Sequence, residues 1–80
     1  MKLPRDVDAK SLIKALGTLG YRPTRQTGSH IRLSRLASPA HSLTIPNHAP
    51  IKLGTLNAIL VEVAAYQRMD KSTLITTLFG

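Results

Sequence analysis

Apolar residues recur at the three- and four-residue intervals that place side chains on one face of a helix. In the segment from Asp8 to Leu19 the members of this face are Leu12, Ile13, Leu16 and Leu19. Asp8 is a favourable N-cap residue, and Gly20 suits the C′ position that follows a helix. The pattern therefore predicts an amphipathic helix over residues 8–19.

Two later segments alternate with the period of two that is typical of a half-buried strand. In residues 30–35, Ile31 and Leu33 share one face, and the opposite face carries His30, Arg32 and Ser34. In residues 41–45, Leu43 and Ile45 alternate in the same way with Ser42 and Thr44. If the apolar side chains face a core, the polar ones lie on the open face of a sheet.

The segment from Tyr21 to Thr27 is a third candidate strand. Pro23 has no backbone N–H to donate, which favours an edge strand or an irregular one. Gly28 and Ser29 then supply a turn or a bulge, because glycine tolerates positive φ. The three strands are short enough to form an antiparallel meander.

Helical spacing returns in the last third of the chain. A second helix is predicted from Leu53 or Gly54 to about Tyr66, with a buried stripe formed by Leu53, Leu56, Ile59, Leu60 and Val63. Asp70 is placed to cap a short third helix, in which Leu74, Ile75, Leu78 and Phe79 can pack back. The order of helix, three strands, helix and short helix predicts one two-layer α+β domain over residues 1–80.

The net charge of the chain indicates what kind of molecule the protein binds. The chain carries 11 Lys and Arg residues against 4 Asp and Glu, a net charge of +7, and no acid occurs between Ala9 and Val61. An ordinary solvated surface intersperses both signs, so this imbalance favours a nucleic-acid-binding face. The cluster Arg22, Arg25, Arg32 and Arg35 falls in or beside the predicted hairpin.

Several classes of protein are disfavoured by composition. The chain has no cysteine, which excludes disulfides and thiolate metal sites. No apolar run approaches the roughly 20 residues of a membrane span, and the start lacks a signal-peptide core, so a cytoplasmic protein is expected. His41 and His48 have no third metal ligand near them in sequence, and paired carboxylates are absent outside the cap regions, so no metal or other cofactor is expected.

His30 is the strongest candidate for chemistry. An imidazole titrates near neutral pH, so it can act as general base or general acid toward the 2′-OH or the leaving 5′ oxygen of RNA. Arg32 is on the same strand face and can bind a phosphate in a bidentate manner. Gly28 would let the chain approach the phosphate closely, and Ser29 could orient the ring.

Five other positions are weaker candidates. Arg25 and Lys52 could contact the RNA backbone. His48 is either a turn residue or a second acid–base group, the latter if its loop folds over the sheet edge. Gly54 and Thr55 are either simply a helix start or a phosphate contact through free N–H groups.

Three short motifs are specific when they occur together: Gly28-Ser29-His30, Ile45-Pro46-Asn47-His48 and Gly54-Thr55-Leu56. With the flanking segments Lys10–Leu16 and Gly20-Tyr21 they resemble HicA-type toxins of bacterial toxin–antitoxin modules. The resemblance covers residues 3–68, and residues 69–80 resemble an extension found in some members. Pro23 departs from the family pattern and indicates a short first strand.

The resemblance implies a fold similar to a double-stranded-RNA-binding domain. It implies a small endoribonuclease that cleaves mRNA and inhibits translation, with His30 as the catalytic histidine. It also implies a HicB-type antitoxin that covers the active face. Metal-independent cleavage is expected on the grounds given above.

Two other functions remain open on the sequence alone. One is a non-catalytic module that binds double-stranded RNA by its shape. The other is an interaction domain whose charge serves an acidic protein partner. The three aromatic residues are too few for a base-stacking reader of single strands, which predicts loose sequence preference.

Overall fold

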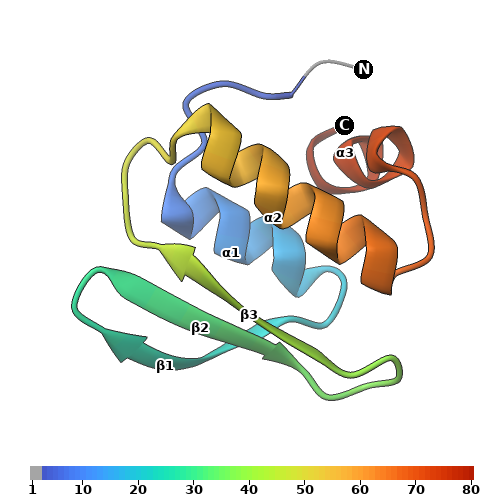
Figure 1. Cartoon of the computed structure of the whole chain (residues 1–80), viewed down its shortest axis with the longest axis horizontal. Coiled ribbons are helices and arrows are strands. Elements are labelled where there is room, and N and C mark those ends of the chain that lie inside the picture. Colours follow the sequence, from blue (N-terminus) through green and yellow to red (C-terminus); the bar gives the residue numbers. More distant parts are fainter. Residues whose placement is uncertain (1–2) are drawn as a thin grey trace.

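The computed structural model describes residues 3–80, which form three helices and one three-stranded antiparallel sheet (Figure 1). The elements follow in the order α1 (Ala9–Gly17), β1 (Arg22–Thr27), β2 (His30–Arg35), β3 (His41–Pro46), α2 (Leu53–Tyr66) and α3 (Lys71–Phe79). The strand order is β1-β2-β3, so sequential strands are neighbours. This confirms the predicted α+β class and element order.

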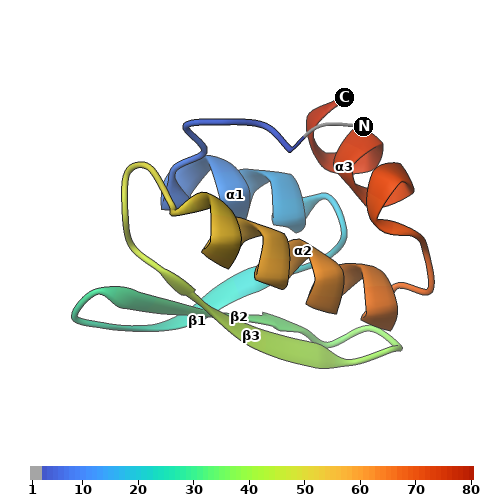
Figure 2. The ribbon, with the colours of Figure 1, turned by 45° about the horizontal axis from the view of Figure 1, so that its top comes forward.

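The helices lie on one side of the sheet, and the other face of the sheet is open (Figure 2). Leu33 and Ile45 project from the sheet into the core, where they join Leu12 and Leu16 of α1 and Leu60 of α2; all five are 0% exposed. On the opposite face His30, Arg32, Ser42 and Thr44 are exposed, as the period-two pattern predicts.

Capping residues place the helix starts. The Asp8 carboxylate accepts a hydrogen bond from the backbone N–H of Ser11 at 2.7 Å, and Asp70 accepts one from Thr73 at 2.7 Å. These hydrogen bonds stabilise the ionised carboxylates and lower the pKa of both groups. Both caps are thus confirmed.

Helix α1 ends earlier than predicted. The prediction extended it to Leu19, whereas it ends at Gly17 with Thr18 as the C-cap residue. The N–H groups of Thr18, Leu19 and Gly20 each donate to the carbonyl three residues earlier, which tightens the last turn into 3₁₀ geometry. Gly20 then adopts a φ of 94°, the left-handed conformation in which glycine carries no penalty.

Strand β1 is an edge strand, as Pro23 predicts, and it is exposed along its whole length. It begins at Arg22, one residue later than predicted, because the N–H of Tyr21 donates to the Leu16 carbonyl instead of to a strand. Its pairing with β2 shifts between Pro23 and Arg25. The irregularity therefore lies inside the strand, while Gly28 and Ser29 form the turn, with Gly28 at a φ of 53°.

The buried stripe of α2 is confirmed at four of its five predicted positions. Leu53 is the exception, with 46% of its surface exposed. Ile51, just before the helix, is 4% exposed and takes a place in the core, and Ala64 extends the stripe at the other end. Within residues 3–80 no helix combines the length and apolar character that a membrane span requires.

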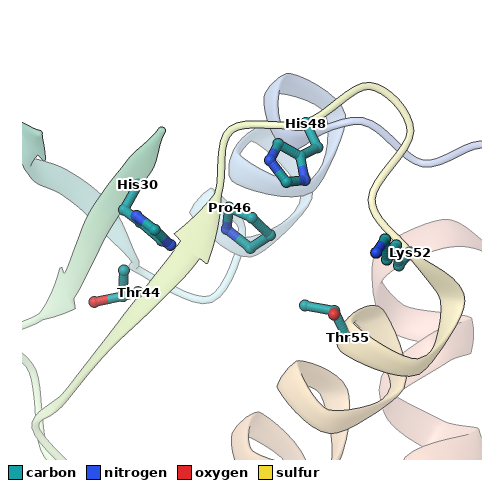
Figure 3. A pocket seen from close by; sticks show the side chains of 6 residues that line it. All are labelled: His30, Thr44, Pro46, His48, Lys52 and Thr55. Carbon is teal, nitrogen blue, oxygen red and sulfur yellow. The ribbon is translucent and has the colours of Figure 1, made fainter. Parts of the chain in front are cut away.

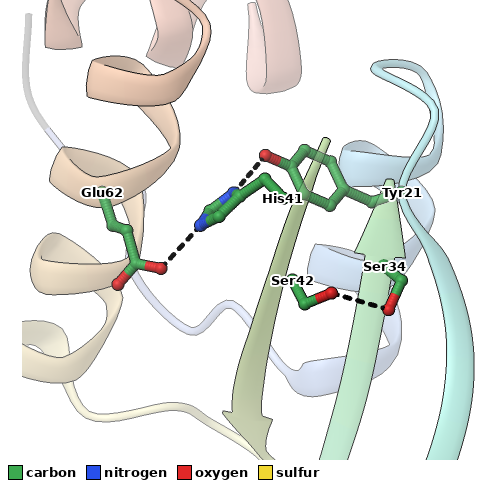
Figure 4. Close-up of polar contacts among 5 residues, drawn as sticks. All are labelled: Tyr21, Ser34, His41, Ser42 and Glu62. Carbon is green, nitrogen blue, oxygen red and sulfur yellow. Dashed lines mark hydrogen bonds and ion pairs between the residues drawn. The ribbon is translucent and has the colours of Figure 1, made fainter. Parts of the chain in front are cut away.

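A partly buried polar cluster joins the sheet to α2 (Figure 4). The Tyr21 hydroxyl and His41 Nδ1 are 2.6 Å apart, and His41 Nε2 lies 2.7 Å from a carboxylate oxygen of Glu62. The His41 ring also stacks on Tyr66, with 3.8 Å between centroids. Burial raises the pKa of the Tyr21 phenol, so the hydroxyl stays protonated and can donate a hydrogen bond to the His41 ring. Sequence reasoning did not connect these residues, which are separated by up to 45 positions along the chain.

Candidate functional site

An open cavity of about 460 Å³ lies between the end of the sheet and the start of α2 (Figure 3). Its wall is formed by His30, Thr44, Pro46, His48, Lys52 and Thr55. Four of these are candidate site residues from the sequence, separated by up to 25 positions: His30, His48, Lys52 and Thr55. The structure therefore brings them to one place.

His30 is positioned by the β1–β2 hairpin. It is the first residue of β2 and pairs with Thr27 on one side and Pro46 on the other. The left-handed Gly28 makes the tight turn that starts β2 at this residue. The imidazole is exposed on the open side of the sheet and faces the cavity (Figure 3).

His48 lies on the β3–α2 loop, and backbone hydrogen bonds hold that loop against both the hairpin and α1. The N–H of Asn47 donates to the Ser29 carbonyl at 2.6 Å, and the His48 carbonyl accepts from the N–H of Ala9 at 3.1 Å. The N–H of Ile51 donates to the Val7 carbonyl at 2.8 Å. The loop thus reaches the sheet edge, the condition under which His48 was a candidate second acid–base group.

Lys52 and Thr55 close the far side of the cavity. Lys52 is the N-cap residue of α2, and Thr55 lies in its first turn. Both are exposed, and in Figure 3 they lie across the cavity from His30. No carboxylate is among the lining residues, so the charge that the wall contributes is positive.

Arg25 and Arg32 lie outside the cavity, on the adjoining open face of the sheet. They are direct partners across the β1–β2 ladder, and both are exposed. Like charges directly opposite on neighbouring strands destabilise a sheet. An anion held between the two guanidinium groups would remove that repulsion.

Arg35 does not belong to this basic face. Its guanidinium donates to the carbonyls of Leu19 at 2.6 Å, Ala37 at 2.7 Å and Pro39 at 3.0 Å. It ties the turn after α1 to the β2–β3 loop. The sequence pattern grouped Arg35 with three hairpin arginines, and the structure assigns it to the scaffold.

Two lining residues were not expected from the sequence. Thr44 was placed on the open face, and Pro46 was noted only as part of the Ile45–His48 motif. Their places follow from the register, since Pro46 pairs with His30 and Thr44 with Arg32. Alternation shows which face a residue takes, but only the register shows which residue lies beside it.

The part of the chain that the structure describes holds no cluster of three His, Asp or Glu side chains able to bind a metal ion. His41 and His48 are not part of one site, because His41 is enclosed by Tyr21, Glu62 and Tyr66. His48 lines the cavity instead.

Comparison with known proteins gives one match. The family model described as the HicA toxin of bacterial toxin–antitoxin systems matches residues 9–64, which include every lining residue of the cavity. No curated protein and no solved structure matches the chain. Because the match covers more than half of the chain, the protein belongs to the HicA toxin family and is the toxin of a toxin–antitoxin system.

Proposed function

We propose that this toxin is an endoribonuclease that cleaves mRNA in the cytoplasm, inhibits translation and uses His30 as a general acid or base. The observation that carries the proposal is the position of His30: an exposed imidazole on a rigid strand end, facing a basic cavity. RNA supplies its own nucleophile, the 2′-OH. The protein therefore has to hold the phosphate, move protons and stabilise the charge that develops on phosphorus.

The open sheet face supports RNA as the substrate. Arg25 and Arg32 present paired positive charge beside the cavity, and Lys52 adds a cation inside it. The two turn residues that precede His30, Gly28 and Ser29, carry no bulky side chain. These groups bind a phosphate backbone without reading bases, which agrees with loose sequence preference.

Removing the two sheet arginines should weaken RNA binding and its dependence on salt. For Arg25→Gln with Arg32→Gln we expect lower affinity, and a log–log salt slope less steep by about 0.7 for each phosphate that the protein no longer neutralises. The measurement is fluorescence anisotropy with labelled RNA over a salt series, using catalytically inactive His30→Ala as the background. Arg68→Asn, at an exposed position after α2, is the matched control. An unchanged slope in the double variant would contradict the proposed role.

Cleavage should not depend on a metal ion. The cavity contains imidazole and ammonium groups and no carboxylate, so proton transfer by side chains is the chemistry its residues support. We expect purified toxin to fragment a full-length mRNA equally well with excess EDTA and with magnesium. Loss of cleavage in EDTA would contradict metal-independence, while binding without any cleavage would favour the alternative, a non-catalytic double-stranded-RNA-binding module.

The partner that we propose is a HicB-type antitoxin that covers the cavity. The net charge of +7 and the open basic sheet face favour an acidic or shape-matched cover. Covering His30 would stop cleavage without unfolding the toxin. Retained cleavage by the saturated complex would contradict this arrangement.

A further inference from the structure

The cavity contains two imidazoles, and the reaction proposed above requires two proton transfers. One proton leaves the 2′-OH as it attacks phosphorus, and another reaches the 5′ oxygen as its bond to phosphorus breaks. The two oxygens lie on opposite sides of phosphorus in an in-line displacement. A single imidazole on one side of the phosphate cannot reach both.

We infer that His48 is the second catalytic residue and that His30 and His48 act as an acid–base pair; this rests on the proposed ribonuclease function. Both side chains are exposed and line the same cavity. Figure 3 shows His30 entering from the end of β2 and His48 from the loop above it. The other lining residues offer an ammonium, two hydroxyls and a proline ring, and among these side-chain types imidazole is the usual general acid or base of catalysis.

The placement of His48 is built into the fold. Backbone hydrogen bonds hold the loop at Asn47, His48 and Ile51, and they connect it to the hairpin turn, to α1 and to the segment before α1. Catalytic groups on loops need this support, because a loss of alignment of about 1 Å can cost roughly 100-fold in rate. The hydrogen bond from Asn47 to Ser29 in particular links the His48 loop to the residue that precedes His30.

The steps balance without a cofactor. One imidazole takes the 2′-OH proton while O2′ bonds to phosphorus, and the other imidazole, initially protonated, gives its proton to O5′ as the P–O5′ bond breaks. The products are a 2′,3′-cyclic phosphate and a 5′-hydroxyl end. Lys52, on the opposite wall, is placed to balance negative charge on the non-bridging oxygens. Exchange with water then returns both imidazoles to their starting protonation states.

A change of leaving group separates the acid from the base. The substrates are an RNA oligonucleotide that carries a mapped cleavage site and the same oligonucleotide with sulfur in place of the bridging 5′ oxygen. A thiolate leaves without protonation, so the sulfur substrate has no need of a general acid. The enzymes are the wild type, His30→Ala and His48→Ala, each shown to be folded by circular dichroism.

We expect each variant to cleave the ordinary RNA at least about 100-fold more slowly than the wild type. With the sulfur substrate one variant, and only one, should recover to within roughly tenfold of the wild type; the rescued position is the acid. The pH–rate profile of the wild type should be bell-shaped, and each variant should lose one limb.

Other outcomes overturn the inference in distinguishable ways. If His48→Ala cleaves ordinary RNA as fast as the wild type, the ribonuclease function stands and His48 has no catalytic role. If neither variant is rescued by sulfur, or both are, the acid–base pair is wrong and His48 acts in binding alone. If the wild type cleaves neither substrate, the proposed function fails together with the inference.

Discussion

Replacing His30 by alanine should abolish the toxicity of this protein while leaving its fold intact. A positioned acid–base group contributes about 10²- to 10⁴-fold to a rate. The exposed His30 imidazole ends the Gly28-Ser29-His30 motif and lines the cavity. Induced expression of the wild type should arrest growth and degrade mRNA, whereas His30→Ala should do neither. Growth curves and northern blots of total mRNA provide the measurement.

The fold must be checked in the same variant. His30 is exposed, so its truncation removes little packing, and thermal unfolding of His30→Ala should match the wild type closely. Equal toxicity of the two folded proteins would place the catalytic residue elsewhere. If neither protein degraded mRNA, the RNA-binding alternative would take precedence.

The architecture was accessible from the sequence because local signals agree with one another. The strand from His30 to Arg35 alternates polar and apolar residues as far as Ser34, and its predicted bounds are the observed ones. The two aspartate caps were identified by residue type alone. Predicted bounds are wrong where two signals disagree. The helical spacing of Leu19 extended the predicted α1 past Gly17, whereas the chain after Gly17 forms a 3₁₀ turn.

The candidate site could be predicted from the sequence only in part. His30 follows from strand alternation and from its motif, but the approach of His48 depends on a loop whose path is decided by hydrogen bonds to Ser29 and Ala9. No local pattern encodes such long-range backbone contacts. For the same reason Arg25 and Arg32 could be assigned to one hairpin, whereas their direct pairing across a shifted register could not be derived.

The role of the buried His41, unlike that of His30, could not be predicted from the sequence, because no neighbouring residue indicates it. Its side chain is 4% exposed, and both of its ring nitrogens have partners. Since a carboxylate only accepts, Nε2 carries the hydrogen toward Glu62, and in the neutral ring Nδ1 accepts from the Tyr21 hydroxyl. One imidazole thereby joins the start of β1, the start of β3 and the middle of α2.

His41→Ala should therefore destabilise the protein strongly without touching its chemistry. The change leaves a cavity beside the core and removes the His41 partner of the hydroxyl on Tyr21, a residue that is 1% exposed. Together these losses cost roughly 3 kcal/mol. For a domain of this size that corresponds to a fall in Tm of about 10 to 20 °C. Differential scanning calorimetry of the purified variant is the measurement, and His30→Ala is its matched histidine-to-alanine control.

The part of the stability loss that comes from the Tyr21–His41 hydrogen bond can be separated from the part that comes from reduced packing. Tyr21→Phe removes the same hydrogen bond and keeps the ring, so alone it should cost about 1 to 3 kcal/mol. In the His41→Ala background the hydroxyl has already lost its hydrogen bond to His41, and the added cost of Tyr21→Phe should be close to zero. Fully additive losses of stability would show that the Tyr21–His41 hydrogen bond contributes nothing to stability. Below its Tm, His41→Ala should cleave RNA at the wild-type rate, because His41 is outside the cavity that holds His30.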